Sequence, residues 1–533
     1  MGRKKKIVEE VVLKPSHYQE AIYDFVEHDV GNLVVEAAAG AGKTSTLLQI
    51  LRLLPSDKKV LFCAFNKDIV KEITKKVPKD ITNVDIRTVH SLGFLMIQRN
   101  LKGEEIIPNE NKYRQFIYNN LDVISMIDTT YMKYKDRMKY IDNICNLVDF
   151  ARFYLVNSEK EIEKLVDRYD VDIIADEVEA TIKVLEWGKT SINEIDFTDM
   201  IWLPYVLDLK PIGLLFDYIL GDECQDFSIA QRELLLRCRK INTRMFFFGD
   251  KNQAIYSFCS ADPQSFDVLK SLPNTKSLPL SISYRCAKNI VRFAQNIVET
   301  IEHNEANINE GEIKYNVQLE EVEDGDMVLC RNTAPLMEVY RRGVSEGRKM
   351  YFRGEELGNN LKLSADCAQG DTIKEIIFSM KKRLIATWDF LTKEFNLDPR
   401  ETMTDRRIVS LLDTIKTMEN LPKTVENRKD LDKFVKDVFS EEGKEGIQLS
   451  TIHRAKGLEA DNVFIICPSL IPSRLAELDW EKDEEKHLQY VMCTRPKNTL
   501  NFVTEQEIRP HSAFSENNSF YNELMEIKKE LNG

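Results

Sequence analysis

The sequence predicts an α/β protein with two α/β domains, each interrupted by a mainly helical insertion. Three observations support this prediction. Short apolar runs alternate with polar helical stretches near the N-terminus, and they return after residue 194, which is typical of a parallel sheet covered by helices. Two long charged stretches with few strand-like segments lie between the apolar runs. The chain has 533 residues, 43% of them hydrophobic, and is long enough for several cores.

The first α/β domain is expected to comprise residues 1–102 and 194–276, with a helical insertion at 103–193. Its first part alternates predicted strands and helices, at 33–36, 60–65 and 84–88 for the strands and at 44–53 and 67–76 for the helices. The insertion contains charged helical segments such as 158–169. Strand-like segments return at 214–220 and 244–248, so the domain is expected to resume after its insertion.

The second α/β domain is expected at residues 277–354 and 447–533, with a helical insertion at 355–446. Strands are predicted at 326–330 and 462–467. The insertion is rich in lysine and glutamate, and the chain contains no internal repeat or low-complexity tract. Two α/β cores with one helical insertion each are therefore predicted.

Composition limits the classes of function. With 74 basic and 87 acidic side chains the formal net charge is -13, so a global basic field for nucleic acid is excluded. The basic cluster at residues 3–6 is more simply a solvated terminus than a contact. Ten cysteines form no CxxC pair and seven histidines do not cluster with them, so zinc, iron–sulfur and disulfide frameworks lack support. No apolar stretch approaches the roughly 20 residues of a membrane-spanning helix.

A phosphate-binding loop is predicted directly after the apolar run at residues 33–35. Residues 38–44 read Ala-Ala-Gly-Ala-Gly-Lys-Thr, and Ala37 stands where the general pattern GxxxxGKT has its first glycine. Glycines let successive backbone N–H groups point at a polyphosphate, lysine adds a charge and threonine a hydroxyl for Mg²⁺. The alternative is a Gly/Ala-rich turn without function. The predicted nucleotide-binding residues are Ala39, Gly40, Ala41, Gly42, Lys43, Thr44 and Ser45.

An acidic pair follows the strand predicted at 214–220. Asp222 and Glu223 would lie at the carboxyl end of a buried strand, where ligands of open α/β sheets bind. Asp222 is then suited to hold Mg²⁺ through water, and Glu223 to orient or deprotonate an attacking water. A solvated acidic turn is the alternative, but the phosphate loop favours the catalytic interpretation.

The run Asp222-Glu223-Cys224-Gln225-Asp226 and eight further segments resemble the UvrD/Rep-like family of superfamily 1 DNA helicases. The segments occur in order at residues 15–19, 65–67, 88–91, 195–200, 249–256, 283–285, 448–459 and 489–495. Their compact spacing is most similar to the phage and F-box helicase branches. The resemblance implies two RecA-like P-loop domains, with a 1B-like first insertion and a short 2B-like second insertion.

The resemblance also implies the roles of further residues around a nucleotide. The residues implied on the base and ribose side are Gln19, Tyr284 and Glu459, and Gly457 is implied as a further nucleotide-binding residue. Gln253 is implied as the γ-phosphate sensor that couples to DNA. Arg285 and Arg495 are implied as arginine fingers from the second domain, which agrees with the need of a loose phosphoryl-transfer transition state for positive charge from several directions.

Single-stranded DNA is the implied polymer track. Aromatic faces stack on bases without regard to base identity, which suits a motor that steps along any sequence. The candidate DNA-binding residues are Phe65, Asn66, His90, Tyr256, Phe258 and His453. For Phe65 and Phe258, the alternative interpretation is that they are core residues.

Four residues depart from the family pattern. Phe258 is followed by Cys259 where tryptophan and arginine are common, and Ser45 stands where an adenine-packing arginine is common. Arg495 is followed by Pro496, which predicts that a helix after Arg495 begins or breaks there. The second insertion is also shorter than in the larger bacterial relatives, which argues against regulation by its rotation.

Together these features predict an ATP- and Mg²⁺-dependent DNA helicase or single-strand translocase, 3′ to 5′ by resemblance. Its expected partners are single-stranded DNA and DNA with single-stranded tails, with no membrane. The expected location is the cytoplasm of a bacterial or phage-infected cell, or another reducing compartment. Three alternatives stay open: a translocase that strips bound proteins without unwinding, an RNA-directed motor, and a helicase–nuclease fusion. For the fusion, the 38 residues after Arg495 (496–533) are expected to be too few.

Overall fold

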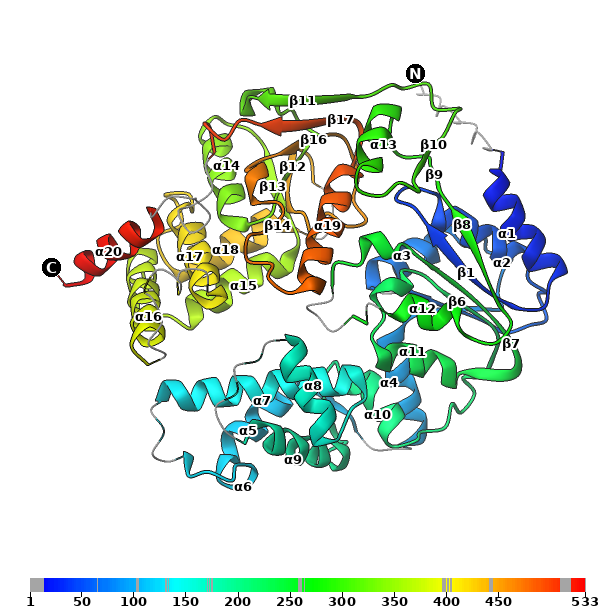
Figure 1. Cartoon of the computed structure of the whole chain (residues 1–533), viewed down its shortest axis with the longest axis horizontal. Helices are drawn as coiled ribbons and strands as arrows, with labels where there is room; N and C mark the ends of the chain where they lie inside the picture. Colours follow the sequence, from blue (N-terminus) through cyan, green and yellow to red (C-terminus); the bar gives the residue numbers. More distant parts are fainter. Residues whose placement is uncertain are drawn as a thin grey trace, which may run out of the picture. The chain divides into compact units, whose positions relative to one another are not determined.

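The computed structural model describes residues 14–64, 66–101, 105–129, 132, 134–169, 171, 173, 176–256, 261–262, 264–394, 399, 402, 405–440, 444–508 and 519–532. Contacts divide the chain into two compact units (Figure 1). The first unit comprises the residues up to Ala37 together with Gly42–Ser281, and the second comprises Ala38–Ala41 together with Ile282–Gly533. Each unit contains one large parallel sheet with helices packed on it, which confirms the predicted α/β class.

The first unit is built on six parallel strands in the order β3-β2-β6-β7-β1-β8. Their bounds are Asn32–Ala37 for β1, Val60–Ala64 for β2, Val84–Thr88 for β3, Phe216–Gly221 for β6, Arg239–Gly249 for β7 and Thr275–Leu280 for β8. Strand β1 lies between β7 and β8, and its residues Leu33, Val34 and Val35 are fully buried. Continuous apolar runs are typical of strands that are covered on both faces.

Some helices of this unit begin at a side chain that accepts one of their first N–H groups, whereas α2 begins after a glycine. Helix α1 (His17–His28) opens with a capping box in which Ser16 accepts the N–H of Gln19 and Gln19 accepts that of Ser16. Helix α2 (Lys43–Leu53) starts after Gly42. The other helices are α3 (Lys67–Lys76), α4 (Val89–Asn100), α10 (Asp199–Val206), α11 (Ile229–Arg237) and α12 (Ser265–Lys270).

The first insertion is helical, as predicted. It contains α5 (Lys112–Asn119), α6 (Leu121–Ile124), α7 (Tyr134–Tyr154), α8 (Glu159–Tyr169) and α9 (Glu177–Thr190), and a short strand pair, β4 (Ile107–Pro108) with β5 (Glu194–Ile195), lies at its base. Its hydrophobic core includes Ile144 and Leu147 of α7 and continues into Trp202 of α10. The insertion therefore shares its core with the α/β domain.

A buried ion-pair cluster adds to this connection. The guanidinium of Arg152 on α7 is fully buried and donates to Asp196 at 2.8 and 2.7 Å and to Asp199 at 3.0 Å. Asp199 also accepts from Lys112 Nζ and from the hydroxyl of Tyr113, both at 2.6 Å. The cluster thus joins helices α5 and α7 to the start of α10.

The second unit has seven parallel strands in the order β11-β17-β16-β12-β15-β13-β14. Their bounds are Glu312–Val317 for β11, Met327–Cys330 for β12, Met350–Arg353 for β13, Phe439–Ser440 for β14, Ile447–Thr451 for β15, Ala460–Ile465 for β16 and Pro496–Val503 for β17. A separate pair joins β9 (Ile282–Ser283) to β10 (Glu302–His303). Helices α13 (Lys288–Gln295), α14 (Thr333–Ser345) and α19 (Asp479–Cys493) belong to the same domain.

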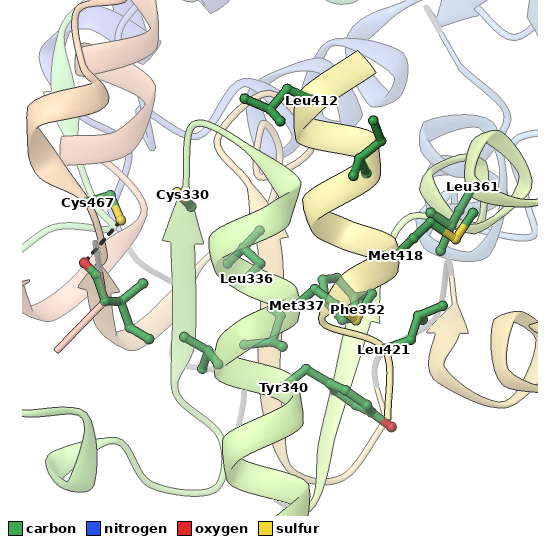
Figure 2. Close-up of a cluster of buried hydrophobic side chains, with 14 of the residues drawn as sticks. Cys330, Leu336, Met337, Tyr340, Phe352, Leu361, Leu412, Met418, Leu421 and Cys467 are labelled. Carbon is green, nitrogen blue, oxygen red and sulfur yellow. Dashed lines mark hydrogen bonds between the residues drawn. The ribbon is translucent and has the colours of Figure 1, made fainter. Parts of the chain in front are cut away.

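The second insertion is fused to this sheet by one hydrophobic core. It consists of α15 (Glu355–Asp366), α16 (Ile373–Glu394), α17 (Arg406–Glu419) and α18 (Arg428–Val438), and α20 (Ser519–Asn532) packs on α16. Figure 2 shows Leu336 of α14, Phe352 of β13 and Leu412 of α17 within the same buried cluster. Because the sheet and the insertion share these contacts, the insertion is not a separate body.

Two sequence expectations differ from the structure. The boundary expected between residues 276 and 277 falls inside β8, which pairs with β1 and so belongs to the first sheet. Arg495 is followed by strand β17 and not by a helix, because Pro496 is accepted as the first residue of a strand. No helix in the described parts of the chain is both long enough and apolar enough to cross a membrane.

Candidate active site and nucleic-acid interface

Three neighbouring strands of the first sheet end in predicted site residues. Strand β1 leads into the loop at 38–42, β6 ends directly before Asp222 and Glu223, and β7 ends directly before Asp250. These strands are adjacent in the order β6-β7-β1 and run parallel. Their carboxyl ends therefore meet at one edge of the sheet, where α/β proteins bind ligands.

The loop before α2 has the backbone of an anion-binding turn. Gly40 and Gly42 have φ angles of 71° and 83°, which glycine adopts without the strain that other residues meet. Lys43 and Thr44 then form the first turn of α2. The N–H groups and the positive end of the helix dipole are in this way available to a phosphate.

Lys43 and Glu223 form the central ion pair of the site. Lys43 Nζ donates to Glu223 Oε1 at 2.6 Å, and both side chains are mostly buried. Burial alone would lower the pKa of Lys43, but the carboxylates of Glu223, Asp222 and Asp250 outweigh it and raise the pKa. Lys43 is therefore held in its charged form by three carboxylates that come from two strand ends.

Asp222 is suited to hold a divalent cation. Its carboxyl group is 3% exposed, and its Oδ1 accepts the N–H of Glu223 at 2.9 Å. Burial and the neighbouring Glu223 raise its pKa to about 7, against the opposing effect of Lys43. Within the described residues no three His, Cys, Asp or Glu side chains are grouped to hold an ion by themselves. Mg²⁺, which favours one or two carboxylates together with phosphate oxygens, fits Asp222 and the hydroxyl of Thr44.

Gln253 lies in the same network. Its amide Nε2 donates to Asp250 Oδ2 at 2.7 Å, and its side chain is buried. Asp250 caps the short turn at Lys251–Gln253 by accepting the N–H of Asn252 at 3.0 Å. The predicted phosphate sensor is thus anchored to the end of β7.

Gln19 lies against the helix that follows the loop. Its Nε2 donates to Thr46 Oγ1 at 3.0 Å, while its Oε1 serves the capping box of α1. Ser45 is exposed, and its hydroxyl donates to the carbonyl of Gly42 at 2.8 Å. Ala39 and Ala41 are buried.

The residues predicted on the second domain gather at the amino ends of β16 and β17. Arg285 Nε donates to Glu459 Oε2 at 2.7 Å, and its Nη1 donates to the carbonyl of Thr494 at 3.2 Å. Glu459 also pairs with Lys497 at 2.9 Å. Burial raises the pKa of Glu459, but the two cations outweigh it and lower the pKa. Tyr284 directly precedes Arg285, and Gly457 has a φ of 82°.

Arg495 differs from Arg285 in its surroundings. Its side chain is 1% exposed. Its guanidinium donates to the carbonyls of Val491 at 2.9 Å and Leu458 at 3.1 Å, and to the hydroxyl of Thr494 at 2.9 Å. In this structure Arg495 therefore ties the turn before β16 to the end of α19.

The candidate DNA-binding residues differ in their location and in their contacts. Phe65 and Phe258 lie outside the described residues. Asn66 caps α3, because its Oδ1 accepts the N–H of Ile69 at 2.9 Å. Tyr256 is half-buried after the turn that contains Gln253. His453 follows β15 at the carboxyl edge of the second sheet, and burial together with Arg331 lowers its pKa to about 3.

His90 forms an aromatic stack that the sequence did not reveal. Its ring lies 3.8 Å from that of Phe197, centroid to centroid, at an angle of 16°. His90 is 8% exposed whereas Phe197 is 44% exposed. Burial lowers the pKa of His90 to about 4, so its ring is neutral at physiological pH. Phe197, and not His90, presents the accessible face.

Two residues were therefore missed as site residues, although both belong to segments that carried the resemblance. Phe197 lies between Asp196 and Thr198, and an aromatic residue there gave no signal of exposure. Gln225 follows Glu223 by two residues, and its side chain contacts both Glu223 and the backbone of Asp250. A search for polar residues at the carboxyl strand ends would have found Gln225.

The sheet order, the glycine turn before α2 and the lysine–carboxylate pair define a P-loop protein with two RecA-like domains. Two family models match the chain, the UvrD/REP helicase N-terminal domain over residues 19–273 and the UvrD-like helicase C-terminal domain over residues 371–507. The chain belongs to the UvrD-like family of superfamily 1 helicases.

Named relatives agree with this assignment. The chain is 23% identical to the ATP-dependent DNA helicase PcrA of Staphylococcus epidermidis, over 94% of this chain and 85% of that protein. It is 25% identical to a probable DNA helicase II homolog of Mycoplasma pneumoniae, over 50% of this chain and 40% of that protein. It is 24% identical to the F-box DNA helicase protein 1 of Schizosaccharomyces pombe, over 49% of this chain and 30% of that protein. The chain thus spans less than half the length of some of its relatives.

Proposed function

We propose that this protein is an ATP-dependent DNA helicase that translocates along single-stranded DNA from 3′ to 5′. The observation that carries the proposal is the contact of the phosphate-loop lysine, Lys43, with the carboxylate of Glu223 at the ligand-binding edge of a parallel sheet. The names of the relatives support DNA as the polymer. The direction rests on the family resemblance alone.

Lys43 and Glu223 have complementary tasks in hydrolysis. A bound triphosphate offers Lys43 a partner of higher charge than Glu223, so the lysine is expected to turn from Glu223 Oε1 to the phosphates. Glu223 Oε1 then becomes available to accept a proton from the attacking water. Mg²⁺ held by Asp222 and Thr44 would neutralise charge on the phosphate oxygens.

The roles of Arg285 and Arg495 as arginine fingers follow from the resemblance. Arg285 is the better placed of the two to change partner, because its contacts are one exposed carboxylate and one carbonyl. For Arg495 to reach a phosphate, it must leave several acceptors of its own domain.

DNA is proposed to stack on exposed aromatic faces of the first unit. Phe197 supplies one such face, with the neutral ring of His90 behind it. Stacking of this kind is tolerant of base sequence. Binding of DNA through stacking on aromatic side chains needs no basic surface over the whole protein. It is therefore compatible with the net charge of -13.

The decisive test is steady-state ATP hydrolysis with and without single-stranded DNA, on the wild type and on Glu223→Gln. We expect strong stimulation by DNA and its loss in the variant. Hydrolysis that is indifferent to DNA would contradict the DNA assignment and leave only a nucleotide hydrolase. Equal stimulation by RNA would favour an RNA-directed motor.

Unwinding is tested separately on forked duplexes with a 3′ or a 5′ tail. We expect strand separation only from the 3′ tail. Displacement of a bound protein without strand separation would replace the helicase by a translocase that strips proteins.

A further inference from the structure

Gln225 connects two parts of the site that the proposed function leaves separate. It lies in the short turn Cys224–Asp226 that follows Glu223, and it is 3% exposed. Its amide Nε2 donates to Glu223 Oε2 at 2.6 Å, and its Oε1 accepts the backbone N–H of Asp250 at 3.0 Å. One side chain therefore joins the turn after β6 to the turn after β7.

Each carboxylate oxygen of Glu223 accepts a hydrogen bond from a different side chain. Its Oε1 accepts from Lys43 and its Oε2 accepts from Gln225. When Lys43 turns to a phosphate, Oε1 loses the hydrogen bond from Lys43, while Oε2 keeps the hydrogen bond from Gln225. The carboxylate then keeps its orientation at the moment when it has to receive a proton.

The network continues from Gln225 to the coupling segment. Asp250, whose N–H is bound by Gln225, accepts from Gln253 Nε2 through its carboxylate. A hydrogen-bonded chain thus runs from Lys43 through Glu223, Gln225 and Asp250 to Gln253. All five side chains are buried or mostly buried, and such networks respond as a unit.

Gly249 leaves the space that this contact needs. A Cβ atom at Gly249 would lie 2.5 Å from Gln225 Oε1 and 3.2 Å from Gln225 N. Any side chain there would push the amide of Gln225 away from the N–H of Asp250. The hydrogen bond between Gln225 and Asp250 therefore requires a residue without a side chain at position 249, the last residue of β7.

We infer that Gln225 is a positioning residue that aligns Glu223 for hydrolysis. Through the same side chain, the position of Glu223 is coupled to the position of the Asp250–Gln253 turn. The inference rests on the proposed role of Glu223. It adds a route within the first unit by which the hydrolysis site and the segment leading to Tyr256 influence each other.

The test compares two buried glutamines. Gln225→Met removes the hydrogen bonds to Glu223 and Asp250, together with a longer one from Nε2 to Asp226 Oδ2 at 3.3 Å, at nearly constant volume. The matched control is Gln231→Met, because Gln231 is 4% exposed on the next helix and only caps it, accepting the N–H of Ser228 at 2.8 Å. Gln225→Glu retains an acceptor for the Asp250 N–H but loses the donor to Glu223.

The readouts are kcat, KM for ATP and the ratio of DNA-stimulated to basal hydrolysis. Gln225→Met should lower the stimulated kcat by at least about tenfold and lower the ratio, with KM for ATP little changed. Gln225→Glu should lower kcat but retain more of the ratio. Gln231→Met should lower only the melting temperature.

Wild-type kcat and ratio in Gln225→Met, or the same losses in Gln231→Met, would overturn the inference. Failure of the proposed function is distinguishable from this result. If DNA does not stimulate the wild type, the proposed function fails, and the kcat comparison between the two glutamine variants still decides whether Gln225 positions Glu223. If Glu223→Gln hydrolyses normally, both the proposed role of Glu223 and the inference fail.

Discussion

Lys43 Nζ and Glu223 Oε1 are 2.6 Å apart, although the two residues are 180 positions apart in the sequence. The pair neutralises a buried cation and a buried anion at the ligand-binding edge of the first sheet. Binding of a phosphate is expected to exchange one partner of Lys43 for another. Replacing Lys43 and replacing Glu223 should therefore affect different steps of the reaction.

Lys43→Met is expected to weaken nucleotide binding by about tenfold to a hundredfold, because a charge-assisted contact to phosphate is lost. Glu223→Gln should bind nucleotide normally but lower kcat by about a hundredfold or more, because the proton acceptor is lost. Fluorescent-nucleotide titration and single-turnover hydrolysis separate the two effects. Equal loss of binding in both variants would contradict the division of roles.

Arg285 and Arg495 should also differ. Arg285→Ala is expected to lower kcat with little change in melting temperature, since its side chain makes two contacts, one of them to a carboxylate that is 41% exposed. Arg495→Ala should lower kcat and also the melting temperature, because carbonyls of Val491 and Leu458 lose a buried donor. Thermal melting beside ATPase assays checks this. A normal melting temperature for Arg495→Ala would show that its backbone contacts are dispensable.

The buried cluster of Arg152 should fix the first insertion. Arg152→Met leaves Asp196 and Asp199 without their main cation, and breaking a buried pair costs about 3–5 kcal/mol. The matched control is Arg114→Met, whose pair with Asp142 is about half exposed and contributes about 0–1 kcal/mol. Hydrogen–deuterium exchange of α5 and α7 measures the difference. Similar protection in both variants would refute the role of the cluster.

Phe197 should contribute to DNA affinity. Phe197→Ala is expected to weaken binding of single-stranded DNA by about 1–3 kcal/mol, the contribution of one stacked base. Tyr315→Ala is the control, because Tyr315 is another exposed aromatic residue, stacked on Phe502 in the second unit. Fluorescence anisotropy with a labelled oligonucleotide gives both affinities. Unchanged affinity in Phe197→Ala would remove this residue from the track.

The neutral state of His90 predicts a dependence of stability on pH. Its pKa is about 4 when folded because of burial, against about 6.5 when exposed, so the unfolded chain binds the proton more readily. This contribution to stability is fully present above pH 6.5 and is lost as the pH falls toward 4. At pH 5.5 the loss is about 1 kcal/mol. Melting temperatures between pH 7.5 and 5.5 should fall more steeply for the wild type than for His90→Gln, and equal slopes would refute it.

The sequence predicted the α/β class, the strand ends that carry the site and the order of the segments because these depend on local chemistry. Glycines at positions 40 and 42 are needed for positive φ angles, which the structure has. Apolar runs followed by polar turns identified β1 and β6, with ends that differ by one or two residues from those observed. Family membership followed from the same local segments and is confirmed by the two family models.

The partners of the side chains could not be predicted in this way, because they depend on packing between distant segments. Arginine side chains are usually exposed, but the guanidinium of Arg495 is fully buried. Phenylalanine side chains are usually buried, but the ring of Phe197 is accessible. The boundary near residue 277 was misplaced because pairing of β8 with β1 is a long-range contact.

Local sequence patterns identify the groups that are available at the site: a phosphate loop, two carboxylates and a set of arginines. Which of these groups meet depends on the packing of the folded chain. This packing paired Lys43 with Glu223, placed Gln225 between Glu223 and Asp250, and fused the second insertion to its sheet in one core. The reason is physical, since hydrogen bonds act over about 3 Å and apolar contacts over about 4 Å, distances that only the packed chain defines.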